Sequence, residues 1–151
     1  ISLYGLWPSQ ETKDRNSIDL KPVLSWHTKI IQIKNIKAGQ SIGYNRTYKG
    51  EQDCKIAILP VVYYEGYSRS LSNKSQVIIK NKKYSVRGNV CMNLIMIELP
   101  ADTDIKVGEV VTLLGRQNDQ EISVEELAQL SSTINYEVVT KINAQLPRVI
   151  V

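Results

Sequence analysis

Short runs of apolar, β-branched and aromatic residues, separated by turn residues, make up most of the chain before its last third. The run from Val23 to Ile36 alternates loosely and is rich in Val, Ile and Thr, residues that suit a half-buried strand. Ala38-Gly39-Gln40 then indicates a turn. We predict strands over Val23–Ile36, Ser41–Tyr48, Lys55–Val62, Gln76–Lys80, Tyr84–Arg87, Asn93–Glu98 and Glu109–Leu114, with the fourth and fifth joined as a hairpin across Asn81-Lys82.

The hydrophobic period changes after the last of these strands. Ser123-Val124-Glu125-Glu126 has the spacing of a helix capping box, and Leu127 and Leu130 then fall on one helical face. A second short helix is expected from near Thr133, and it carries Tyr136. The polar segment Ser9–Ile18 is expected to be a mobile connector. The fold class is therefore a mainly β domain with one or two short helices near its C-terminus.

The composition is that of one globular domain. A chain of 151 residues is long enough for one core and short for two, so we expect a single domain over residues 1–151. Hydrophobic residues make up 42% of the chain, and no stretch of about 18 apolar residues is present to span a bilayer. The chain opens on Ile1 without an initiator Met, and we expect it to be a fragment of a longer protein.

Charge and cysteine content narrow the function classes. The net charge of +4 and the pI near 9.0 leave one alternative open, a nucleic-acid-binding barrel whose tyrosines stack on bases. Basic and acidic residues are interleaved along the chain, however, and this pattern favours an ordinary solvated surface. Cys54 and Cys91 lack paired spacing, and His27 is the only histidine. We therefore expect a reducing compartment and no structural metal.

Tyrosine placement is the one unusual feature. The chain has eight tyrosines and no phenylalanine, and it lacks the GxGxxG, GxSxG and GKS/T patterns of nucleotide-binding sites and hydrolases. Tyr44 follows Gly43, and Tyr64 and Tyr67 flank Gly66. These tyrosines either pack on a sheet with their hydroxyls in water, or line a site where glycines allow a ligand close to the backbone. Spacing alone leaves both interpretations open.

Gly43-Tyr44-Asn45-Arg46-Thr47-Tyr48 resembles the YGxTY segment of the alanine racemase family. Further segments resemble that family in the same order: Leu20–Ser25, Tyr63–Arg69, Val90–Met92, Val107–Gly115 and Thr133–Glu137. The resemblance implies a barrel-like C-terminal β-domain that follows a (β/α)₈ barrel, in which a lysine holds pyridoxal 5'-phosphate (PLP). It also implies a head-to-tail homodimer in which this domain completes the partner's active site, and an isolated chain that is inactive because the lysine lies in the barrel.

The same resemblance implies roles for single residues. Tyr44 matches the tyrosine base of a two-base proton transfer at Cα, and Tyr136 matches the tyrosine that binds the cofactor phosphate. Met92 matches the residue whose backbone amide meets the substrate carboxylate, and Asn93 lies beside it. Residues at the entrance of the site are implied at Tyr63, Arg69, Asn89 and Ile134.

The chain departs from the family pattern at the substrate wall. An arginine and an aspartate are usual around the CMD segment, where this chain has Asn89 and Asn93, and the entrance segment reads Tyr63-Tyr64-Glu65-Gly66. An asparagine can donate a hydrogen bond as well as accept one, so Asn93 favours a hydroxylated substrate, L-serine alongside L-alanine.

This pattern resembles the racemases of vancomycin resistance, in which a membrane-embedded domain precedes a cytoplasmic racemase module that supplies D-serine for peptidoglycan precursors. Two alternatives stay open. One is an ordinary biosynthetic alanine racemase. The other, of a different class, is a non-catalytic β-domain for dimerisation or binding.

Overall fold

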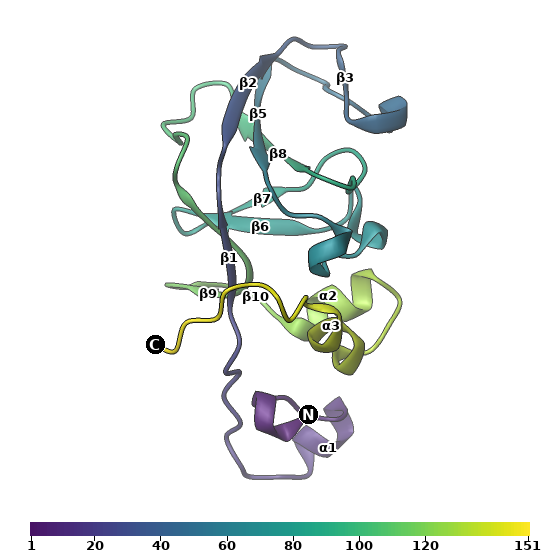
Figure 1. Ribbon diagram of the computed structural model, residues 1–151, viewed down its shortest axis with the longest axis vertical. Helices are drawn as coiled ribbons and strands as arrows, with labels where there is room; N and C mark the ends of the chain where they lie inside the picture. Colours follow the sequence, from purple (N-terminus) through teal and green to yellow (C-terminus); the bar gives the residue numbers. More distant parts are fainter.

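The computed structural model describes residues 1–151 and is built mainly of strands (Figure 1). The strands are β1 (Trp26–Lys29), β2 (Gln32–Ile36), β3 (Ser41–Ile42), β4 (Tyr48–Lys49), β5 (Cys54–Leu59), β6 (Gln76–Ile79), β7 (Lys82–Ser85), β8 (Ile95–Pro100), β9 (Val110–Gln117) and β10 (Gln120–Ile122). The helices are α1 (Gln10–Asp14), α2 (Val124–Leu130) and α3 (Asn135–Lys141), with 3-10 helices η1 (Ser2–Tyr4), η2 (Tyr44–Arg46), η3 (Tyr63–Glu65) and η4 (Arg69–Leu71). The prediction of a mainly β fold with one or two short helices near the C-terminus is confirmed, and the two helices are α2 and α3.

The strands form open sheets that do not close into a barrel, so the expected barrel-like shape holds only loosely. One sheet has the order β1-β9-β6-β7, with β10 paired to β9, and a second has the order β2-β5-β8. A cluster of 24 buried apolar residues, drawn from both sheets and from α2 and α3, forms the common core. Figure 1 places the β2-β5-β8 sheet above the other and the two late helices beside β9 and β10.

The run Val23–Ile36 is two strands, and the prediction of a single long one is wrong. The backbone N–H of Ile30 donates to Glu109, just before β9, whereas that of Ile31 donates to Ile58 in β5. The chain therefore changes sheets between these two residues. Ile30 is 1% exposed at the junction, so the change occurs inside the core, where an apolar pattern continues without a break.

The expected strand Ser41–Tyr48 is likewise interrupted. Only β3 and β4 pair, and η2 lies between them because Gly43, Asn45 and Arg46 all have positive φ. Gly and Asn tolerate the left-handed region, which favours a turn over a continuous strand here. Tyr44 therefore lies in a turn rather than in a strand.

The N-terminal and C-terminal segments are more regular than the sequence indicates. The Ser9–Ile18 segment contains α1, whose N-cap Ser9 accepts a hydrogen bond of 3.2 Å from the backbone of Thr12. Strand β10 was not predicted. Helix α2 begins as expected, since Ser123 Oγ accepts a 3.0 Å bond from the N–H of Glu126, although the Glu126 carboxylate pairs with Lys83 at 3.5 Å.

Candidate functional site

The turn that carries Tyr44 lies directly on the loop that follows β7. A Cβ on Gly43 would lie 3.0 Å from Met96 Cε and 3.2 Å from Gly88 Cα, so only glycine allows this close approach. The side-chain amide of Asn89 donates a 3.1 Å hydrogen bond to the carbonyl oxygen of Tyr44. The Tyr44 ring itself is 70% exposed. The turn therefore holds the backbone in place while it presents the phenol at the surface.

A cluster of three side chains, Tyr48, Arg87 and Glu98, lies next to this turn. Tyr48, in β4, donates a 2.8 Å hydrogen bond to Glu98 in β8, and Arg87 Nε donates to the other carboxylate oxygen at 2.7 Å. The guanidinium of Arg87 also lies over the Tyr48 ring, 4.7 Å from its centroid. Burial, followed by the hydrogen bond to Glu98, raises the pKa of Tyr48 to about 12. The Tyr48 hydroxyl thus remains protonated, and its hydrogen bond to Glu98 joins the β3–β4 pair to β8.

The loop between β7 and β8 carries three of the predicted site residues, Asn89, Met92 and Asn93, and is held by side chains that follow η4. The N–H of Gly88 donates to Asn73 Oδ1 at 2.6 Å, and that of Val90 donates to Ser72 Oγ at 2.9 Å. Ser72 in turn donates its N–H to the carbonyl of Arg69. Arg69 and Asn89 therefore belong to one hydrogen-bonded region with Tyr44, and Met92 and Asn93 lie in the same loop as Asn89.

Tyr63 lies in η3, which contacts the end of α3, whereas Ile134 and Tyr136 lie at the start of that helix. The backbone N–H of Asn143, just after α3, donates a 3.0 Å bond to Glu65. Gly66 lies so close to the end of α3 that a Cβ there would be 2.4 Å from the Lys141 carbonyl oxygen. All three side chains are exposed, Tyr136 at 39%.

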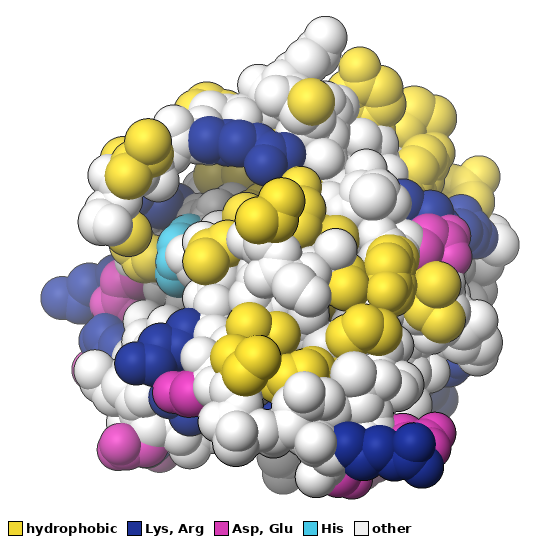
Figure 2. All heavy atoms as spheres, turned by 90° about the horizontal axis from the view of Figure 1, so that it is seen from below, with side chains coloured by type: hydrophobic (Ala, Val, Ile, Leu, Met, Phe, Trp, Pro, Cys, Tyr) yellow, Lys and Arg dark blue, Asp and Glu magenta, His cyan; other side chains and the backbone are white.

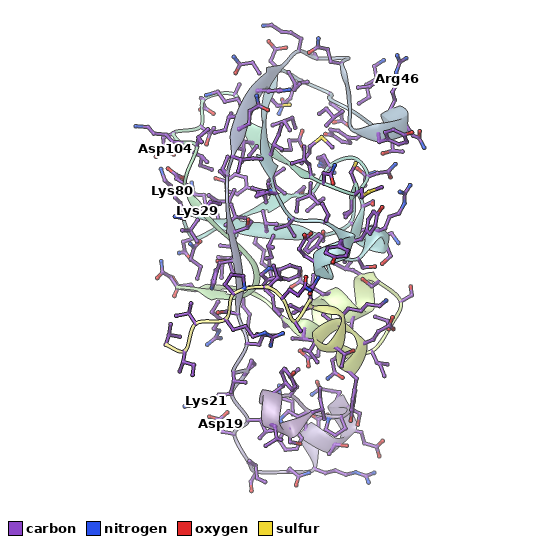
Figure 3. The ribbon with its side chains drawn as sticks, in the orientation of Figure 1. Asp19, Lys21, Lys29, Arg46, Lys80 and Asp104 are labelled. Atoms are coloured by element: carbon purple, nitrogen blue, oxygen red, sulfur yellow. The ribbon has the colours of Figure 1, made fainter.

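The segment from Val62 to Asn73 contacts both α3 and the β7–β8 loop, since Gly66 lies against α3 and Asn73 holds Gly88. In Figure 1, η2, the β7–β8 loop, η3 and α3 all lie on the right-hand side of the molecule. Figure 3 marks the upper end of that side by Arg46, which lies two residues after Tyr44. The elements that carry the predicted site residues therefore lie on one side of the domain, and we call their exposed side chains, which include Tyr44, Tyr136 and Asn93, the surface of phenols and amides.

The supporting cluster of Arg87 and Glu98 was not predicted from the sequence. A signal for it exists in β8, whose burial alternates, so that Ile95, Ile97 and Leu99 face the core while Met96 and Glu98 are half-buried on the other face. That alternation places Glu98 on the side where the Tyr44 turn lies. The sequence did not indicate that Tyr48 is a hydrogen-bond partner of Glu98, because the two residues are distant along the chain.

The structure also bears on metal binding, on membrane-spanning helices and on the distribution of surface charge. No group of three or more His, Cys, Asp or Glu side chains is arranged to hold a metal ion, and no helix is both long and apolar enough to cross a bilayer. Figure 2 shows basic and acidic side chains interleaved on the face that it displays. This face carries no extended basic patch.

Comparisons with known proteins agree with the geometry. Residues 23–150 match the family described as "Alanine racemase, C-terminal domain". The chain is 46% identical over 148 residues to an alanine racemase of Halothermothrix orenii, covering 98% of this chain and 38% of that protein. It is 38% identical to an alanine racemase of Leptospira interrogans, covering all of this chain and 40% of the relative. The chain thus spans about two fifths of the length of these curated relatives.

Solved structures resemble the fold closely. An alanine racemase of Bacillus anthracis with bound L-Ala-P superposes with a TM-score of 0.88 at 39% identity, over 94% of this chain and 36% of the other. A histidine racemase of Leuconostoc mesenteroides has the same TM-score at 27% identity, over 99% of this chain and 39% of its own. Similar domains therefore occur in racemases named for different amino acids.

Proposed function

The chain belongs to the family of alanine racemase C-terminal domains, and from this premise we propose that it forms part of a PLP-dependent amino-acid racemase. The observation that carries the proposal is the Tyr44 turn. Its backbone is fixed by Asn89 and by the close contact of Gly43 with Gly88, while its phenol projects outward from the domain. A phenol held in this way suits proton transfer to an atom supplied from outside the chain.

The proposed partners are an N-terminal barrel domain and a second copy of the protein arranged head to tail. Support comes from the exposed apolar side chains that lie among the site residues, including Met92, Tyr63 and Ile134. The relatives are also more than twice as long as this chain. In this arrangement the surface of phenols and amides closes an active site whose remaining groups belong to the barrel.

The residues of this chain fit PLP as one wall of its site. The Tyr136 phenol is 39% exposed and can donate one hydrogen bond to a phosphate oxygen, but the cation and lysine that the cofactor needs are expected outside this chain. When bound, PLP supplies the electron sink that lowers the barrier to removing a proton from Cα.

The remaining steps belong to this chain's own side chains. Tyr44 takes the proton from one face of the substrate Cα, or returns it there, while a base outside this chain acts on the opposite face. The backbone amide of Met92, in the exposed turn closed by the Cys91 N–H bond to Leu94, binds the substrate carboxylate. Tyr63, Arg69, Asn89 and Ile134 border the entrance.

L-alanine is the first proposed substrate, because the relatives above are named alanine racemases. L-serine is proposed as a second substrate on the basis of Asn93, an exposed amide next to Met92. An amide can donate to a serine hydroxyl that an alanine side chain lacks. This specificity is the one that the resemblance to the racemases of vancomycin resistance implies.

The reaction is tested in the natural full-length protein that contains this chain, loaded with PLP, by measuring D-isomer formed from L-alanine and from L-serine. Replacing Tyr44→Phe removes the proton-carrying oxygen and is expected to lower turnover by about 10²–10⁴-fold. Tyr84→Phe, on β7 away from the site, is the matched control and is expected to stay within about twofold. Undiminished turnover in Tyr44→Phe contradicts the role of Tyr44, and a folded, PLP-loaded protein that converts neither amino acid contradicts the proposed function.

The serine proposal has its own test in Asn93→Asp, which keeps the size of the side chain but removes its donor. We expect the ratio of serine to alanine turnover to fall on the order of tenfold, because the serine hydroxyl loses a partner while alanine does not. Asn118→Asp, exposed in the turn between β9 and β10, is the control. An unchanged ratio, or no serine turnover by the unmodified protein, leaves an ordinary alanine racemase.

A further inference from the structure

A separate cavity lies beneath the two late helices, between them and the sheet that contains β1 and β9. Its volume is about 170 Å³. Its floor is formed by apolar side chains that are nearly completely buried, namely Leu71, Leu114 and Leu127, together with Tyr67. Trp26 completes the floor and meets Tyr67 edge-to-face, with ring centroids 6.0 Å apart and an angle of 67°. The lining therefore offers aromatic edges and aliphatic surface.

The opening of the cavity is polar. It lies at the turn between α2 and α3, where Ser131 and Thr133 line it together with Glu137 and Lys141 of α3. The Glu137 carboxylate accepts a hydrogen bond from Thr133 Oγ1 and pairs with Lys141, and the hydrogen bond to Lys141 is the main reason why its pKa lies below its usual value. The carboxylate and the ammonium neutralise each other, so the rim offers hydrogen-bonding groups without a free charge.

The size and chemistry of the cavity select one class of ligand. An apolar cavity of about 150 Å³ in another protein holds benzene, so about 170 Å³ accommodates a single ring with a small substituent. An ionised ligand would lose its hydration without gaining a free counter-charge at the rim. A neutral ring with one hydroxyl can bury the ring against Trp26 and Tyr67 and direct the hydroxyl to Ser131 or Glu137.

We propose that the cavity between α2, α3 and β9 is a binding site for an uncharged, single-ring aromatic molecule with one hydrogen-bonding substituent, of the phenol class. The site is distinct from the surface around Tyr44, since none of the residues proposed for proton transfer or substrate binding lines it. Its outer wall is α3, whose exposed residue Tyr136 belongs to the proposed active site. The binding proposal does not depend on the racemase activity.

Binding is measured on the natural full-length protein by ligand-observed NMR, with phenol as the probe and benzoate as its charged counterpart. Saturable phenol binding with a dissociation constant of about 1 mM or below is expected, together with at least tenfold weaker binding of benzoate. Ser131→Phe fills the cavity from the C-cap of α2, whose helical backbone accepts any L-residue, and is expected to weaken phenol binding at least tenfold. Gln129→Phe adds the same ring on the exposed side of α2 and is expected to leave binding within twofold.

A second variant tests whether Ser131→Phe weakens phenol binding by filling the cavity or only by disturbing the fold. Leu127→Ala enlarges the cavity from its floor and is expected to admit 2-naphthol, which the unmodified protein binds at least tenfold more weakly. Circular dichroism establishes that each variant is folded. Absence of saturable phenol binding to the unmodified protein, or phenol binding by folded Ser131→Phe equal to that of Gln129→Phe, overturns the proposal. Failure of Leu127→Ala to gain 2-naphthol binding also overturns the assigned location.

Discussion

The side-chain amide of Asn89 donates a 3.1 Å hydrogen bond to the main-chain carbonyl of Tyr44, although the two residues lie 45 positions apart. Both were singled out from the sequence for separate reasons, Tyr44 as a base and Asn89 as a departure from an expected arginine. Their contact indicates that Asn89 acts as a positioning residue for the Tyr44 turn. An amide suits that task, because it donates to a carbonyl without bringing a charge to the surface of the site.

Asn89→Ala is expected to loosen the Tyr44 turn. The loss of one partly exposed hydrogen bond should lower the free energy of unfolding by about 0.5–1.5 kcal/mol. The racemisation that we propose for the full-length protein should fall on the order of tenfold, because the phenol is no longer held in position. Asn16→Ala removes a similar bond, from Asn16 Nδ2 to the carbonyl of Thr12, outside the site. Equal turnover in the two variants would show that the Asn89 bond does not position Tyr44.

Gly66→Ala is expected to separate η3 from α3. Gly66 has φ of 106°, and a Cβ there would lie 2.4 Å from the Lys141 carbonyl oxygen, so both strain and a backbone clash oppose the substitution. We expect a loss of more than about 3 kcal/mol in the free energy of unfolding. Gly108→Ala is the matched control, since Gly108 has φ of 90° but nothing within 4 Å of the new Cβ. Its loss should be only about 1–2 kcal/mol in urea unfolding, and similar losses in both variants would contradict the close contact.

Glu98→Gln is expected to weaken the cluster of Tyr48, Arg87 and Glu98 next to the Tyr44 turn. The side chains of Glu98 and Arg87 are 22% and 30% exposed, so their ion pair is only partly screened by water, and its loss should reduce the free energy of unfolding by about 1–2 kcal/mol. Glu121→Gln breaks the more exposed pair with Arg116, whose side chains are 38% and 76% exposed. That control should change stability by less than about 0.5 kcal/mol in the same urea titration. A larger loss in the control than in Glu98→Gln would run against this reasoning.

The stability of the domain is expected to fall in alkali, and Tyr67 is one of the two tyrosines, with Tyr48, whose raised pKa contributes to this fall. Burial raises the pKa of Tyr67 from 10.0 to about 12. Below pH 10 the hydroxyl is protonated in both folded and unfolded chains, so its stabilising contribution is fully present. As the pH rises toward 12 the unfolded chain loses this proton first, and about 2–3 kcal/mol of stability is lost.

Tyr67→Phe lacks this ionisation and is expected to show a shallower decline between pH 10 and 12, measured by urea unfolding at a series of pH values. At neutral pH the same variant should be less stable by about 1 kcal/mol, since it loses the 2.8 Å hydrogen bond with Ser75. Tyr44→Phe, altered at an exposed ring, is the control and should follow the unmodified chain. Parallel declines in all three proteins would mean that ionisation of Tyr67 does not contribute to the loss of stability between pH 10 and 12.

Local sequence patterns predicted much of the secondary structure. The strand pattern identified β5, β8 and the β6–β7 hairpin to within a few residues, and Ser123 marked the start of α2 correctly. Boundaries were less accurate, since the turn of the hairpin lies at Lys80 and Asn81, one residue earlier than expected. Resemblance to a family supplied the site residues, because a tyrosine beside a glycine is not specific by itself.

The sequence by itself determined the class of fold, the late helices and the set of residues to inspect, because side-chain period and turn chemistry are local properties of a chain. Only the tertiary structure decided that Ile30 and Ile31 pair with different sheets, that Asn89 meets Tyr44, and that a cavity remains beneath α3. Each of these depends on which distant segments come together. That choice is made by the packing of the whole core, and no local period records it.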